Sequence, residues 1–213
     1  MKKILIIAIL FSVLFNAESH AQKDTTKLKG MIYSFVPQYL INHGIRLDIE
    51  KQITPRSFIQ FCPQFYLGEQ KDNSSNGNYY NDISYEEDDY DNVIGGGINI
   101  YHKIFANKNF LDNGVYFSYG FSYSYFEIDY LEEYLDNTIN TTGTIQKMGG
   151  DLLIGYQFFL KNKLSIDLYT GVGTRFSELD NNTGNTNRFN DNYFSYNYSG
   201  NLLHIGFRVG LIL

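Results

Sequence analysis

The stretch 202-LLHIGFRVGLIL-213 decides the predicted fold, because apolar side chains alternate along it with polar or small ones. Successive side chains of a β-strand point to opposite faces. One face of this segment therefore carries the polar His204 and Arg208 between glycines, with the apolar Leu202 and Ile212 at its two ends. The other face is wholly apolar and consists of Leu203, Ile205, Phe207, Val209, Leu211 and Leu213. The segment is predicted to be a strand with one apolar and one polar face.

The same period of two recurs along the chain and defines eight predicted strands in total. The composition agrees, since 19 Tyr and 17 Phe against 3 Pro favour pleated structure. Pro37 and Pro63 interrupt the pattern, and we interpret both as bulges near a rim, because proline removes a hydrogen bond of the ladder. The other predicted strands are a first one at about 30–40, then 44–52, 58–67, 93–104, 115–126, 147–158 and 164–176.

The first residues have the pattern of an export signal. Lys2 and Lys3 precede an apolar run, and small residues precede a cleavage site after Ala21. The apolar run, residues 4–15, is shorter than the ~20 residues that a membrane-spanning helix needs. We predict a cleaved signal peptide at 1–21, a periplasmic segment at 22–29 and a single barrel domain at 30–213. The lone Cys62 is interpreted as a small buried side chain.

The charge distribution excludes one class of partner. The chain has a net charge of −6, and residues 69–91 hold eight carboxylates against one lysine. Such a surface repels the phosphates of nucleic acid. A nucleic-acid-binding protein is therefore not expected.

The connections between the predicted strands are of two kinds. Those at 53–57, 106–114 and 160–164 are short or moderate, whereas 68–92, 129–143 and 178–200 are long and polar. Apart from a brief first hairpin at 41–43, the two kinds alternate. Transmembrane barrels show this asymmetry, with short periplasmic turns and long extracellular loops. We predict an all-β protein, a transmembrane antiparallel up-and-down β-barrel of eight strands.

A soluble barrel with a ligand cavity is the alternative, because its strands alternate in the same way with the faces reversed. The export signal, the asymmetric loops and the terminal strand favour the membrane barrel. A strand of about 12 residues tilted by about 40° covers roughly 30 Å, which is enough for the apolar band.

The chain resembles the small eight-stranded outer-membrane barrels of the OmpA/OmpX type, and more closely the short barrel proteins of the Bacteroidota. The resemblance rests on the signal sequence, on 44-GIRLDIEKQITPRSFIQF-61 and on the terminal strand. It implies location in the cell outer membrane and contact with outer-membrane lipid and lipopolysaccharide. Terminal strands of such proteins usually end in an aromatic residue, whereas this chain ends in Leu213.

Charged residues on the polar faces are predicted to lie in the lumen. An eight-stranded barrel is filled by its side chains, and unpaired buried charges are costly, so we expect a salt-bridged plug. A gated ion or proton path is the alternative, and a general porin is not expected. The predicted luminal residues are Arg46, Asp48, Glu50, Lys103, Lys147, Asp151, Asp167, Arg175 and Arg208.

Catalytic residues and cofactors are not expected. His43 and His204 could meet at the outer rim of a closed barrel, which makes them weak candidates for a metal site or an acid–base pair. His102 stands alone on a face predicted to meet lipid. The acidic segment 81–92 could bind Ca²⁺, although it lacks the spacing of a calcium loop and is better interpreted as a solvated surface.

Tyrosines in the long loops are the candidate contact residues for a partner, because tyrosine is enriched in binding surfaces. The expected function is a non-enzymatic barrel that binds through its loops or outer wall, as an accessory subunit of a larger outer-membrane transport or assembly complex. A narrow channel and a lipid-modifying or proteolytic barrel enzyme are the alternatives. The candidate tyrosines are Tyr79, Tyr80, Tyr85, Tyr90, Tyr130, Tyr134, Tyr193 and Tyr196.

Overall fold

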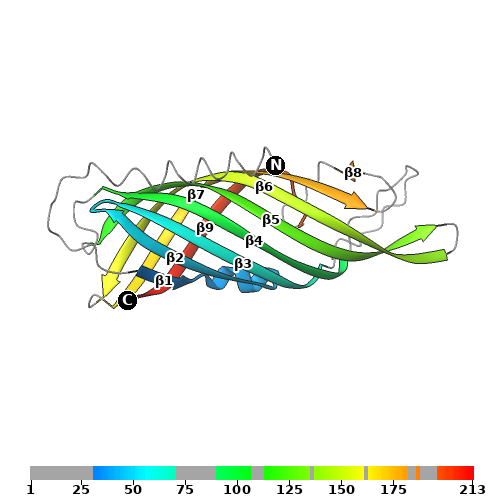
Figure 1. The fold of residues 1–213 in the computed structure, drawn as a ribbon, viewed down its shortest axis with the longest axis horizontal. Coiled ribbons are helices and arrows are strands. Elements are labelled where there is room, and N and C mark those ends of the chain that lie inside the picture. Colours follow the sequence, from blue (N-terminus) through cyan, green and yellow to red (C-terminus); the bar gives the residue numbers. More distant parts are fainter. Residues whose placement is uncertain are drawn as a thin grey trace, which may run out of the picture.

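The described residues form one antiparallel sheet that closes on itself (Figure 1). The computed structural model describes residues 31–70, 90–106, 113–134, 137–160, 163–181, 186–187 and 196–213. The ring order is β1–β2–β3–β4–β5–β6–β7–β9 and back to β1, with the two-residue β8 (Thr186–Asn187) paired to β7. The bounds are β1 Met31–Phe35, β2 Gly44–Thr54, β3 Ser57–Gln70, β4 Tyr90–Phe105, β5 Gly114–Tyr134, β6 Asn137–Leu160, β7 Leu164–Asn181 and β9 Gly200–Ile212.

The predicted eight-stranded up-and-down barrel is confirmed. Each strand pairs with its neighbours in the ring in antiparallel register, and the last strand closes the barrel by pairing with both β7 and β1. In the described part of the chain, no helix is long and apolar enough to cross a membrane. The predicted signal peptide and the segment 22–29 lie outside the described residues.

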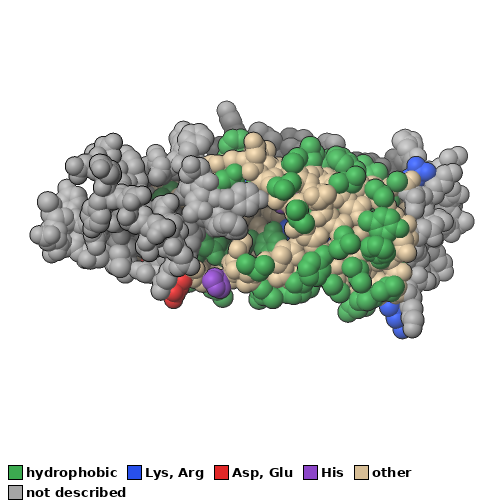
Figure 2. Space-filling view, turned by 180° about the vertical axis from the view of Figure 1, so that it is seen from behind, with side chains coloured by type: hydrophobic (Ala, Val, Ile, Leu, Met, Phe, Trp, Pro, Cys, Tyr) green, Lys and Arg blue, Asp and Glu red, His purple; other side chains and the backbone are tan. Residues whose placement is uncertain are grey.

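The two faces of the barrel wall differ as the alternation predicts. Apolar side chains such as Leu47, Phe121 and Ile154 are exposed on the outside. The space-filling view shows apolar side chains spread over one face of the wall (Figure 2). Charged side chains of the same strands, such as Asp48, Glu50 and Asp151, point inward and are buried. An exposed apolar belt around buried charges matches a barrel that is surrounded by lipid.

The first strand, predicted at about 30–40, ends at Phe35, so the prediction is wrong beyond this residue. Pro37 begins a 3-10 helix, η2 (Pro37–Asn42), so the expected bulge at Pro37 and the expected hairpin at 41–43 are absent. Proline fixes its own φ and lacks an N–H, which suits the first turn of a helix. His43 follows in the left-handed region, with φ 51°, and leads into β2.

The predicted bulge at Pro63 is also wrong. Pro63 lies inside β3, where it pairs with Ile98 of β4 without a shift of register. On the other side of β3, the ladder with β2 keeps one register from Arg46–Gln64 to Ile49–Phe61, across the proline. The sheet therefore accepts Pro63 within a regular strand rather than at a rim.

The connections lie at two ends of the barrel, which we call the turn end and the loop end. The turn end includes the connections after Thr54 and Leu160, and the loop end includes those after Gln70, Tyr134 and Asn181. The long loop predicted at 129–143 is wrong, because β5 and β6 continue as a paired hairpin to Tyr134 and Asn137. This hairpin extends well beyond the other strands at the loop end (Figure 1).

The lumen contains apolar clusters at both ends, with charges between them. Phe58, Phe105 and Tyr116 form the core of the cluster at the turn end, together with Ile32 and Phe159. A second cluster, at the loop end, contains Val93, Phe126, Ile128, Ile145, Leu179 and Tyr196. The predicted small buried side chain, Cys62, packs with Tyr101 and Leu153 in a third cluster and has no disulfide partner.

Candidate functional site in the barrel lumen

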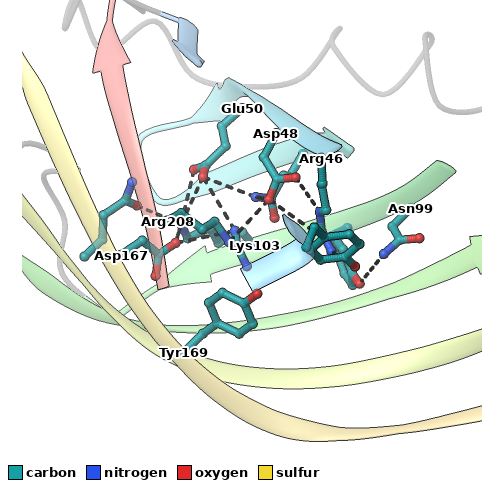
Figure 3. Close-up of polar contacts among 12 residues, drawn as sticks. Arg46, Asp48, Glu50, Asn99, Lys103, Asp167, Tyr169 and Arg208 are labelled. Carbon is teal, nitrogen blue, oxygen red and sulfur yellow. Dashed lines mark hydrogen bonds and ion pairs between the residues drawn. The ribbon is translucent and has the colours of Figure 1, made fainter. Parts of the chain in front are cut away.

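Two buried cations and three carboxylates form a central cluster in the lumen (Figure 3). The Lys103 ammonium lies 3.2 Å from Glu50 and 2.9 Å from Asp167. The Arg208 guanidinium lies 3.3 Å from Asp48, 3.7 Å from Glu50 and 3.4 Å from Asp167. β2, β4, β7 and β9 each contribute to this cluster, so it ties opposite walls of the barrel together.

Arg46 and Asp48 extend the cluster toward the loop end. Both stand on the inner face of β2, two residues apart, and Arg46 donates to both carboxylate oxygens, at 2.6 and 3.1 Å. The Tyr39 hydroxyl from η2 accepts a further hydrogen bond from Arg46 at 2.8 Å. The 3-10 helix is thus attached to the luminal charges by one of its own side chains.

A second group of charges surrounds Asp151 on β6. Arg175 of β7 donates to both oxygens of this carboxylate, at 2.6 and 3.0 Å. His204 Nε2 of β9 lies 2.9 Å from Asp151 Oδ1, and the Tyr101 hydroxyl donates at 2.7 Å. The bidentate geometry is the strong form of the arginine–carboxylate pair.

Lys147 is the exception among the nine predicted luminal charges. The other eight, four cations and four carboxylates, all form ion pairs with one another. The Lys147 ammonium instead lies 5.5 Å from the centre of the Phe126 ring, and no carboxylate of the described residues pairs with it. Among the described residues, the lumen therefore holds one cation without a paired carboxylate, close to its loop end.

Polar and aromatic side chains that were not predicted as site residues complete the network. Tyr116 donates to Asp167 at 2.6 Å, and Gln157 accepts from Lys103 at 2.7 Å. Gln60 donates to Asp48 at 2.9 Å. The Arg208 guanidinium lies 4.3 Å from the Tyr169 ring centre. Their inward position follows from the alternation, and a charge-only criterion missed them because these side chains are neutral.

A cavity of about 790 Å³ lies above the charges at the loop end. Lys147, Arg175 and His204 line it from the barrel wall, and Gln38 and Ile41 line it from η2. Tyrosines and amides make up much of the remaining lining, which includes Tyr39, Asn42, His43, Gln64, Tyr66, Asn99, Ser122, Ser124, Tyr196, Tyr198 and Leu202.

The histidines do not form a metal site in the described part of the chain. His43 and His204 both line the cavity, but no group of three or more His, Cys, Asp or Glu there is placed to hold a metal ion. The expectation that His102 stands alone is wrong. One of its ring nitrogens contacts the Ser57 hydroxyl, and the other lies 2.8 Å from the Tyr119 hydroxyl, on the outer wall.

The candidate tyrosines fall in three groups. Tyr79, Tyr80, Tyr85 and Tyr193 lie outside the described residues, as does most of the acidic segment 81–92. Tyr90, Tyr130 and Tyr134 belong to β4 and β5 rather than to loops. Tyr196 is only 9 % exposed, and its hydroxyl donates to the Asn42 carbonyl at 3.1 Å. Its ring packs against Tyr66 and Phe126, so Tyr196, predicted as a candidate for partner binding, belongs to the apolar cluster at the loop end.

The closed wall, the apolar exterior and the filled lumen define a membrane-spanning β-barrel of the outer-membrane class. A comparison with solved structures agrees with this class. The fold is similar to the crystal structure of a major outer membrane protein from Thermus thermophilus, with a TM-score of 0.50 and 13 % sequence identity. The match covers 86 % of this chain and 99 % of that chain, and at this identity it shows the fold alone. No protein-family model matches the sequence, and no curated protein does.

Proposed function

We propose that this chain is a non-enzymatic outer-membrane barrel with a closed lumen, which acts as a structural and interaction protein. Its outer wall contacts outer-membrane lipid and lipopolysaccharide, and its loop end or wall joins it to a larger transport or assembly complex in the same membrane. The observation that carries the proposal is the central luminal cluster of Lys103, Arg208 and their carboxylates.

The composition of the lumen supports a closed barrel. Lys103, Arg208, Asp48 and Glu50 are buried, and each is in contact with an opposite charge. An ion crossing the barrel would have to displace these pairs, and breaking a buried pair costs about 3–5 kcal/mol. An apolar cluster around Phe58 lies between the charges and the turn end, where it adds a second obstacle to water.

The width of the barrel also argues against the alternative of a narrow channel. Eight strands leave an interior just wide enough for side chains to fill. The loop-end cavity reaches Arg175 and His204, which pair with the buried Asp151, and the central cluster is not part of its lining. The cavity is therefore a blind vestibule above the plug, and it suits binding better than conduction.

The first experiment measures conductance and native mass on the same preparation. In planar bilayers, the purified barrel should show no resolved unitary conductance in concentrated KCl. Extraction from its own membrane in mild detergent should give a particle larger than the lone barrel, with stoichiometric partner proteins. A reproducible unitary conductance would replace the proposal by the channel, and a lone barrel without partners would remove the accessory-subunit role.

A further inference from the structure

The barrel closes between β1 and β9 over only a short stretch of β9. Pairing between β1 and β9 runs only from Met31–Leu213 to Phe35–Val209, because the chain leaves the sheet at Val36. β9 continues toward the loop end with β7 on one edge. On its other edge, residues 204–208 have no strand partner in the described part of the chain, and η2 occupies the place of the missing strand.

This gap lies at the depth of the apolar belt. Residues 204–207 of β9 pair with residues 168–171 of β7. Leu168 and Val172 at this level are exposed on the outer wall, as is Ile205 with 74 % of its surface. Irregular backbone at such a depth is tolerated where it is covered by protein or lines a cavity.

The 3-10 helix connects the gap to the vestibule. Leu40 and Ile41 are 54 % and 80 % exposed, so they present an apolar surface at the gap. Ile41 also lines the luminal cavity, together with Leu202 and His204 of β9. Gln38 lies against Gly206 and donates to the Tyr169 hydroxyl at 2.6 Å. Ile41 therefore has one part of its surface in the cavity and another on the outside of the barrel beside β9.

The charges around the cavity select the kind of ligand. Its lining contains Lys147, whose ammonium lies 5.5 Å from the centre of the Phe126 ring and pairs with no carboxylate of the described residues. Arg175 also lines the cavity, but its charge is already paired with Asp151, which is not part of the lining. The lining carboxylate Glu69 belongs to the exposed end of β3. A buried or half-buried ammonium gains most from an anionic partner.

We propose that the vestibule binds a single-chain anionic amphiphile. Its head group contacts Lys147 inside the barrel, and its acyl chain leaves through the gap between η2 and β9, over Leu40 and Ile41, into the membrane. A cavity of about 790 Å³ is within the range of small-molecule sites. A fatty acid and a lysophospholipid with an anionic head share this chemistry. The site is independent of whether the central cluster conducts ions.

A fluorescence experiment tests the site directly, because the natural chain contains no tryptophan. Ile41→Trp places a single fluorophore at the gap, and Ile154→Trp is the matched control on the exposed outer face of β6. Both are reconstituted into nanodiscs of zwitterionic lipid and titrated with a brominated fatty acid or a brominated anionic lysophospholipid. The corresponding brominated fatty alcohol reports simple partitioning into the bilayer.

The proposal predicts saturable quenching at position 41 by the anionic ligand. The brominated alcohol should quench there with an apparent affinity at least about tenfold lower. Lys147→Gln in the Ile41→Trp background should weaken the anionic ligand by a similar factor and leave the alcohol unchanged. Saturation at lower concentration by the fatty acid would identify a carboxylate head, and saturation at lower concentration by the lysophospholipid would identify a phosphate head. Equal, unsaturable quenching at positions 41 and 154 would overturn the proposal, as would an unchanged affinity in a folded Lys147→Gln variant. If that variant fails to fold, the comparison of acid with alcohol on Ile41→Trp decides the question.

Discussion

Asp151 accepts two hydrogen bonds from Arg175, at 2.6 and 3.0 Å, and this pair joins the inner faces of the adjacent strands β6 and β7. The same carboxylate is in contact with His204 of β9 and with the Tyr101 hydroxyl of β4. One buried side chain therefore connects four strands, and its loss leaves a guanidinium without its carboxylate.

We expect Asp151→Asn to destabilise the barrel by about 3–5 kcal/mol, because removing one partner of a buried ion pair leaves the other charge uncompensated. Urea unfolding of the barrel in lipid vesicles measures the loss. Asp180→Asn, at an exposed position on β7, is the matched control and should change the free energy of unfolding by less than about 0.5 kcal/mol. Equal effects of the two variants would contradict the assigned role of Asp151.

Arg208→Met should open the plug partly as well as destabilise it. The change removes the guanidinium from between Asp48, Glu50 and Asp167 and leaves those carboxylates with fewer cations. We expect a cation-selective conductance in planar bilayers, because the central cluster then keeps only Lys103 against three carboxylates. Lys51→Met removes an exposed cation from β2 and should leave the barrel without measurable conductance. A silent Arg208→Met variant that is folded would place the barrier to ions elsewhere in the lumen.

Gly206→Ala tests how η2 is seated on β9. A Cβ at this position would lie 2.2 Å from Gln38 Nε2 and 2.6 Å from the Tyr169 ring, so the substitution should cost about 1–3 kcal/mol through overpacking. Gly96→Ala, whose nearest neighbour atom would be 3.4 Å away, is the control and should cost less.

Gln38→Ala should reduce the cost of Gly206→Ala, since the two side chains compete for one space. A double-mutant cycle by urea unfolding is expected to give a coupling energy of about 1 kcal/mol. Strict additivity would show that η2 does not pack on Gly206 in the membrane.

His102→Ala separates the structural interpretation from the enzymatic alternative. The ring of His102 contacts the Ser57 and Tyr119 hydroxyls on the outer wall, and in the described residues no carboxylate contacts it. We expect a stability loss of about 1 kcal/mol from the missing hydrogen bonds and no change in the phospholipids or lipid A of the host membrane. Mass spectrometry of the lipids is the measurement, with Tyr119→Phe as the companion variant. Altered lipids in cells that carry His102→Ala would favour the alternative of a barrel enzyme.

The strands and their faces follow from the sequence, because the period of two is a local property of an extended chain. The alternation in 202–213 predicts that Ile205 faces out and Arg208 faces in, and the structure agrees. The alternation is no guide where apolar and polar residues cease to alternate. Pro37 therefore looked like a strand interruption, and the 3-10 helix that begins there was missed.

The tertiary structure alone decided which luminal charges meet. Lys103 and Asp167 are 64 residues apart in the chain, and their contact depends on the curvature and closure of the barrel. The isolation of Lys147 has the same origin, since Arg175 on the next strand turns toward Asp151 instead of sharing a carboxylate with it. Sequence determined which side chains enter the lumen because each residue's face is set by its own strand. Closure of the sheet determined their partners, because ion pairing across a barrel depends on the register of all the strands in between.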